Sequence, residues 1–151
     1  MAACCGSSLW VRKMLSQRPF KDTNEVYASA ERFWRELPPN EWLEAFRAHP
    51  RIGEKKPESS KGERAEGWSA KEQASMDSAG DTVRTDLARA NAEYEKKFGW
   101  IYIVCATGKS PEEMLALCRT RLRNTPDEEL KIAAEAQLKI TRLRLDKLLT
   151  L

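Results

Sequence analysis

Histidine is the scarcest chemical group in this sequence, since the 151 residues contain only one, His49. This excludes a zinc site built from two or more histidines, and a Ser-His-Asp triad would have to use this same ring. Because imidazole exchanges protons near neutral pH, His49 is the first candidate for acid/base chemistry. The alternative is a purely structural role, because a cation is favourable at a helix C-terminus and Pro50 discourages helical geometry in the residue before it.

The sequence also lacks long apolar runs and segregated charge. No stretch approaches the roughly 20 apolar residues of a transmembrane helix, so we expect no membrane span. The 26 basic and 23 acidic residues are interleaved along the chain, with a net charge of +3. This pattern argues against nucleic-acid binding. The N-terminus shows no secretory signal pattern.

Metal-ligand and disulfide patterns are missing as well. The cysteines are Cys4, Cys5, Cys105 and Cys118, and their spacing matches neither kind of site, which favours a reducing compartment. Cys105 and Cys118 lie in apolar runs, so we interpret them as small core residues rather than nucleophiles. With no phosphate-binding glycine loop and no acidic cluster for magnesium, we expect no metal site.

The apolar residues that are present recur mainly at helical spacing, and the length suits one domain over residues 1–151. Asp22, Ser69, Ser110 and Thr125 are predicted N-caps, each with Glu three residues later, and Asn40 is a further N-cap candidate. The prediction is an all-α bundle of about six to seven helices. The expected helical segments are 8–14, 22–37, 40–49, 69–97, 110–124 and 125–149.

Two stretches depart from the helical pattern. Residues 51–68 carry three glycines and many charges without any period, which predicts a long, mobile, solvated loop. Residues 100–106 form the only β-branched and aromatic run, without a partner strand in view. We therefore expect an isolated extended segment in the core, with unpaired backbone groups available to a ligand.

A lone histidine needs a second group to orient it. Glu72, at a helix start, is one candidate, although its spacing from Ser69 is also that of an ordinary capping box. Gln73 could hydrogen-bond a urea-like or amide-like ligand, or face solvent. In the last helix, Arg144 lies at the edge of the apolar stripe and Arg142 among charged residues, so Arg144 is the better candidate for binding an anion.

Several motifs together resemble one known family. These are Cys5-Gly6-Ser7, Trp42-Leu43-Glu44-Ala45-Phe46, His49-Pro50-Arg51-Ile52-Gly53, Glu72-Gln73, Lys97-Phe98-Gly99 and Leu143-Arg144-Leu145. In this order, over nearly the whole chain, they resemble 2-oxo-4-hydroxy-4-carboxy-5-ureidoimidazoline (OHCU) decarboxylases, which complete the conversion of urate to (S)-allantoin. The charged stretch from Glu54 to Gly67 departs from the family's pattern.

The resemblance implies an all-helical homodimer that decarboxylates OHCU without a metal or organic cofactor. It implies catalytic roles for His49 and Glu72. It implies substrate contacts for Pro50, Ser69, Gln73, Ile103, Val104, Cys105 and Arg144. Plant members are similar to half of a bifunctional protein whose other half is a hydroxyisourate hydrolase, and the Cys-Cys-Gly-Ser start looks plant-like. We therefore expect fusion to such a hydrolase and a peroxisomal or cytoplasmic location.

The rival interpretation is a non-catalytic helical interaction module. In that case His49 is only a helix-terminal residue, and the charged loop is the contact surface. The two interpretations differ in geometry, because only the enzyme requires His49, Glu72 and Arg144 to converge on one cavity.

Overall fold

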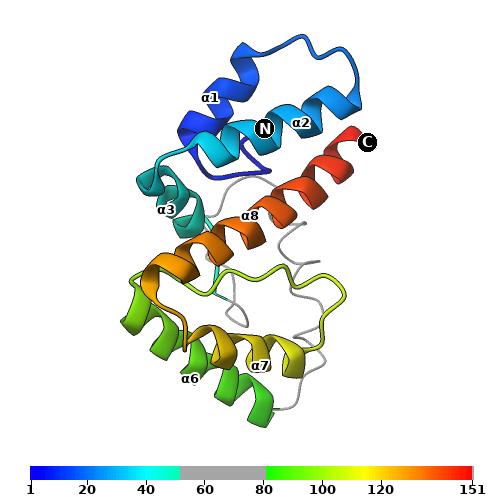
Figure 1. The fold of residues 1–151 in the computed structure, drawn as a ribbon. Coiled ribbons are helices and arrows are strands. Elements are labelled where there is room, and N and C mark those ends of the chain that lie inside the picture. The colour runs from blue at the N-terminus through cyan, green and yellow to red at the C-terminus, as the bar shows by residue number, and fades with distance from the viewer. Residues whose placement is uncertain (52–80, 151) are drawn as a thin grey trace.

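The computed structural model describes residues 1–51 and 81–150. The helices in these ranges are α1 Ser8–Ser16, α2 Thr23–Glu36, α3 Pro39–Arg47, α6 Asp81–Phe98, α7 Pro111–Arg121 and α8 Pro126–Leu149 (Figure 1). The described residues contain no strand, which confirms the all-α prediction. None of the described helices combines the length and apolar character needed to cross a bilayer.

Side-chain caps start three of these helices as predicted. The side chains of Asp22, Ser110 and Thr125 each accept a hydrogen bond from the backbone N–H three residues later, at 2.8, 3.1 and 3.3 Å. Each of these bonds satisfies one of the backbone donors that a helix start leaves unpaired. The expected helix start at Ser69 lies outside the described residues, and α6 is described from Asp81 onward.

The predicted N-cap at Asn40 is wrong. Helix α3 begins at Pro39, with Pro38 in the N-cap position and no side-chain cap. A proline in the first turn loses nothing by lacking an N–H, because that donor would have no partner inside the helix. The dipeptide that ends the preceding helical pattern therefore also starts the next helix.

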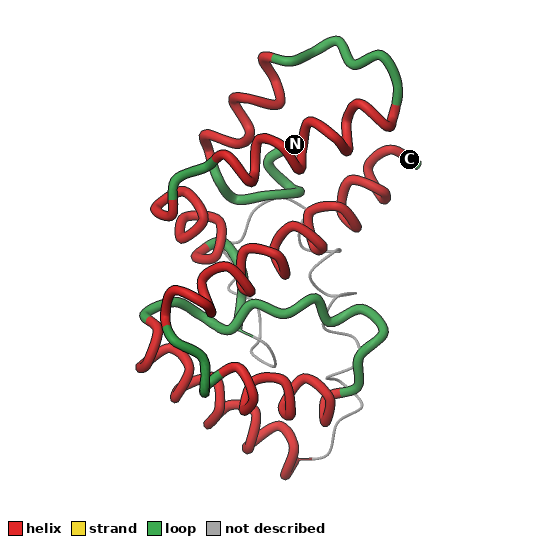
Figure 2. Tube along the Cα trace, in the orientation of Figure 1, coloured by secondary structure: helices red, strands yellow, loops and turns green. Residues whose placement is uncertain are grey.

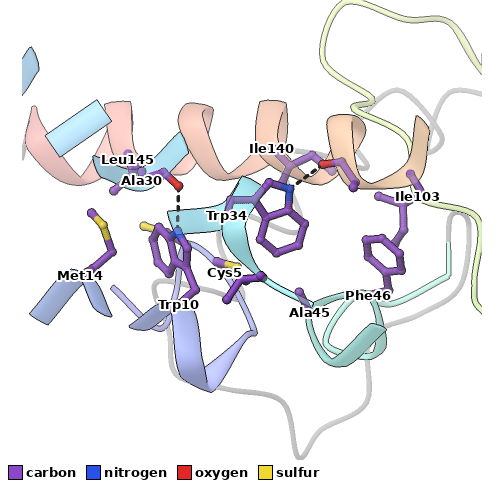
Figure 3. Packing of buried hydrophobic residues seen from close by; sticks show 14 of the residues in the cluster. Cys5, Trp10, Met14, Ala30, Trp34, Ala45, Phe46, Ile103, Ile140 and Leu145 are labelled. Carbon is purple, nitrogen blue, oxygen red and sulfur yellow. Dashed lines mark hydrogen bonds between the residues drawn. The ribbon is translucent and has the colours of Figure 1, made fainter. Parts of the chain in front are cut away.

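The first hydrophobic core lies between α8 and the three N-terminal helices (Figure 3). Two buried tryptophans cross it, and each indole N–H donates to a helix backbone carbonyl at 3.0 Å: Trp10 to Ala30, and Trp34 to Ala134. These bonds satisfy the polar atom of a large side chain that is otherwise enclosed by apolar groups. They fix α1 to α2, and α2 to α8.

A second core lies between α6 and α7, and the run from Trp100 to Ala106 lies between the two cores. Figure 2 shows this run as a loop beside α8. Its side chains alternate, with Tyr102 and Val104 in the second core and Ile103 in the first. The predicted isolated extended segment is confirmed. Gly99, with φ of +87°, makes the turn from α6 into it, a backbone conformation that glycine adopts without strain.

Candidate active site

His49 lies at the exit of α3, directly after the C-cap residue Ala48, as the sequence predicted. Its backbone N–H donates to the carbonyl of Phe46 at 3.2 Å, which ends the helix, and its side chain is half-buried. Pro50 follows and is also half-buried. The Nε of Arg51 then pairs with Glu95 of α6 at 2.7 Å. The chain around His49 is thus held by α3 on one side and by α6 on the other.

The imidazole meets a buried amide on α8. His49 Nε2 lies 2.5 Å from Oε1 of Gln137, and Nε2 of Gln137 donates to Oγ1 of Thr141 at 3.0 Å. Gln137 is fully buried and Thr141 is 2% exposed. Thr141 in turn lies beside the side chain of Cys5. A line of contacts therefore runs from the buried N-terminal segment to the histidine ring.

Cys5 cannot act as a nucleophile in this position. Burial raises the pKa of its thiol to about 12, and the lesser opposing effects of Thr141 and the positive charge of Arg144 do not compensate. The group therefore stays a neutral thiol at physiological pH and packs as a small apolar side chain.

The two arginines of α8 differ in burial, as the sequence predicted. Arg144 is 9% exposed and lies on the same side of the helix as Thr141 and Gln137, one and two turns away. Arg142 is exposed, and its guanidinium carbon lies 4.8 Å from the ring centre of Tyr27. Arg144 thus adjoins the buried contacts that reach His49, whereas Arg142 covers the outer surface.

The backbone of the extended segment is less available than expected. The carbonyl of Ile103 accepts a hydrogen bond from Nη1 of Arg121 at 2.7 Å, and that of Cys105 accepts one from Nζ of Lys109 at 2.8 Å. The prediction of unpaired groups is wrong for these carbonyls, because long cationic side chains from neighbouring segments reach them. Within the described residues, the N–H groups from Ile103 through Val104 to Cys105 donate no hydrogen bond.

Arg121 is itself held by a buried carboxylate at the start of α8. Its Nε and Nη2 lie 2.8 and 2.6 Å from Oε2 of Glu129, which is fully buried. Glu129 also accepts hydrogen bonds from the hydroxyl of Tyr94 and from Nδ2 of Asn124. Burial alone would lower the pKa of Arg121, but the bonds to Glu129 raise it, so the guanidinium keeps its charge. The pair ties α6, α7 and α8 to the extended segment.

Gly6 lets the N-terminal segment approach the histidine helix. A Cβ at this position would lie 2.5 Å from Cβ of Ala48 and 3.4 Å from the backbone of Ala45. The next residues are fixed to the same helix, because Ser7 Oγ donates to Glu41 at 3.0 Å. Only glycine therefore fits between Cys5 and the end of α3.

We expect Gly6→Ala to lower the free energy of unfolding by about 1–3 kcal/mol, the usual cost of inserting a methyl group where there is no room. The clash falls on Ala48, next to His49, so any activity that depends on His49 should fall as well. Thermal unfolding followed by circular dichroism measures the first effect. The double variant Gly6→Ala/Ala48→Gly removes the clashing methyl group and should recover most of the loss; no recovery would contradict the steric explanation.

Comparison with known proteins shows to which family the chain belongs. The model of the OHCU decarboxylase family matches residues 1–146. The chain belongs to this family. It is 36% identical over 145 residues to the uric acid degradation bifunctional protein TTL of Arabidopsis thaliana, covering 96% of the chain and 45% of that protein. It is 30% identical over 135 residues to the OHCU decarboxylase of Amia calva, covering 89% of the chain and 76% of that enzyme.

The same family has a solved structure with this fold. A crystal structure of OHCU decarboxylase in the presence of (S)-allantoin superposes with a TM-score of 0.85 at 36% identity, covering 99% of this chain and 96% of that one. The present chain spans less than half the length of the Arabidopsis protein.

The structure describes six of the nine site residues inferred from the sequence. These are His49, Pro50, Ile103, Val104, Cys105 and Arg144. The other three, Ser69, Glu72 and Gln73, lie outside the described residues. Gln137 was not among the candidates, although a glutamine four residues before Thr141 and seven before Arg144 lies on the same helix face.

Proposed function

We propose that this chain decarboxylates OHCU to (S)-allantoin, a step of urate degradation, as a carbon-carbon lyase. The observation that carries the proposal is the contact of His49 with the buried Gln137, on the face of α8 that also bears the buried Arg144, in a chain of this family. Family membership along residues 1–146 disfavours the non-catalytic module.

The substrate supplies its own electron acceptor. In OHCU one ring carbon, C4, bears both the hydroxyl and the carboxylate, and its neighbour C5 belongs to an imine and bears the ureido group. When the bond from C4 to the carboxylate breaks, its electron pair forms a double bond between C4 and C5, and the imine nitrogen takes a proton. The resulting enol loses its hydroxyl proton and gains one at C5, which gives allantoin. The protein must orient the carboxylate and protonate one face of C5.

The proposed roles of the residues follow from these bond changes and proton transfers. His49 takes the hydroxyl proton and returns a proton to C5, and Glu72 orients the imidazole or holds the ureido N–H groups. Arg144 binds substrate carbonyl oxygens or neutralises anionic charge. Pro50 forms a wall beside His49. Ser69, Gln73 and the backbone from Ile103 through Val104 to Cys105 complete the contacts.

A coupled reaction tests the function. Urate is oxidised by uricase in the presence of hydroxyisourate hydrolase, and the purified chain is then added while the circular dichroism of (S)-allantoin is followed. We expect the (S)-allantoin signal to rise faster in proportion to the amount of chain added. A time course identical to the one without the chain would contradict the proposal.

Arg144→Ala should raise the KM for OHCU by about tenfold or more, because a buried arginine that binds an anion contributes charged hydrogen bonds worth about 1.5–3 kcal/mol each. Arg142→Ala is the matched control from the same helix, and we expect its KM to stay within about twofold of the original. Initial rates in the coupled assay give both values. Equal effects, or the reverse order, would overturn the assignment of Arg144.

Organisation beyond this site is also proposed. We infer that residues 1–151 form one domain, that two copies form a homodimer, and that the chain is joined to a hydroxyisourate hydrolase in a peroxisomal or cytoplasmic protein. The bifunctional Arabidopsis relative, of which the chain covers 45%, supports the fusion. Light scattering coupled to gel filtration tests the dimer, and a mass of one copy at micromolar concentration would contradict it.

A further inference from the structure

Both polar atoms of the Gln137 amide have a hydrogen-bonding partner. Its Oε1 lies 2.5 Å from His49 Nε2, and its Nε2 lies 3.0 Å from Thr141 Oγ1. The side chain is fully buried, so water cannot replace either partner. A buried amide in this position is costly to place unless both ends are paired, and here both are paired.

The orientation of this amide follows from its two contacts. Its Nε2 donates to Oγ1 of Thr141, and its Oε1 faces Nε2 of His49. Gln137 therefore presents N–H to Thr141 and the carbonyl oxygen to His49. An amide oxygen can only accept, so Nε2 of His49 must carry a hydrogen.

We propose that Gln137 is a positioning residue that keeps His49 protonated at Nε2, so that Nδ1 is the nitrogen that exchanges the proton with substrate. A hydrogen bond at one imidazole nitrogen sets the chemistry of the other. The amide also fixes the ring plane against α8. This inference rests on the proposed function for its catalytic consequence, but the protonation of the ring is measurable without any substrate.

The single histidine makes that measurement direct. With ¹⁵N-labelled histidine, two-dimensional spectra that correlate the ring carbon-bound hydrogens with both nitrogens contain one spin system, that of His49. At a pH where the ring is neutral, we expect Nε2 to bear the hydrogen and Nδ1 to have the shift of an unprotonated nitrogen. A neutral ring with the hydrogen on Nδ1 would overturn the proposal.

Two substitutions separate positioning from packing. Gln137→Met keeps the volume and removes the acceptor, and we expect kcat to fall about tenfold or more while KM changes less than threefold. Lys139→Met is the control, because it makes the same kind of change at an exposed site on the same helix and should leave kcat unchanged. Wild-type kcat in a folded Gln137→Met protein would overturn the proposal.

Gln137→Glu replaces the neutral acceptor with a carboxylate that favours imidazolium. We expect the pKa of His49 to rise by about one unit or more above its value in the original protein, with the low-pH limb of the kcat profile moving the same way. The charged side chain Arg144 and the Cys5 thiol adjoin the same contacts and are unchanged in this variant. An unchanged pKa of His49 in this variant would contradict the contact between His49 and Gln137.

These readouts keep the two proposals apart. If the chain produces no (S)-allantoin in the coupled assay but the His49 spectrum responds to Gln137→Glu as expected, the proposed function fails and the histidine–glutamine contact stands. If the original chain is active and Gln137→Glu leaves the His49 spectrum unchanged, the proposed function stands and the positioning role of Gln137 fails.

Discussion

His49→Asn should lower kcat for (S)-allantoin formation by about 10²–10⁴-fold, the usual contribution of a positioned acid/base group. Asparagine can still donate a hydrogen bond toward Gln137, but it cannot take up or release a proton near neutral pH. The sequence contains no second histidine that could substitute for it. The coupled assay with freshly generated OHCU measures the loss.

The fold should survive this change, because His49 is half-buried and lies after the last residue of α3. We expect the helical circular dichroism to be retained and the midpoint of thermal unfolding to move by only a few degrees. Arg47→Gln, an exposed polar change in the last turn of the same helix, should keep full activity. Turnover at the original rate by a folded His49→Asn protein would remove His49 from the mechanism.

Glu129→Ala should lower the free energy of unfolding by about 3–5 kcal/mol, because it leaves the buried guanidinium of Arg121 without its counter-ion. It also removes the acceptor of Tyr94 and Asn124 and releases the constraint on the carbonyl of Ile103. Chemical denaturation measures the stability, and the loss is of the order of the whole stability of a small domain.

A second Arg–Glu pair between helices provides the control. Arg35 of α2 pairs with Glu135 of α8, and both side chains are 50% exposed. Exposed pairs contribute about 0–1 kcal/mol, so Glu135→Ala should be nearly neutral. Equal losses from Glu129→Ala and Glu135→Ala would show that burial of the first pair does not matter, contrary to the structure.

The sequence was informative about features that depend on residues only a few positions apart. The caps at Asp22, Ser110 and Thr125 depend on residues three positions apart, and the inward direction of Arg144 depends on neighbours three and four positions away. The exit of the chain from α3 at His49 depends on Pro50. Such features need no knowledge of how the helices pack, so the sequence pattern was sufficient.

The sequence was uninformative where partners lie far apart along the chain. His49 and Gln137 are 88 positions apart, and nothing in either local pattern pairs them. The carbonyl of Ile103 was expected to be available because no partner strand is in view, yet Arg121 reaches it from α7. The fit of Gly6 against Ala48 likewise exists only once the N-terminal segment lies on α3.

Periodicity, capping and side-chain chemistry are properties of short stretches, so they were enough to predict the all-α class, the extended run between helices, and the one group able to exchange protons near neutral pH. Helix packing established which nitrogen of His49 meets Gln137 and which carbonyls of the extended run are already bonded. Those outcomes depend on which distant side chains are buried together, where unpaired polar groups are costly and water cannot supply a substitute.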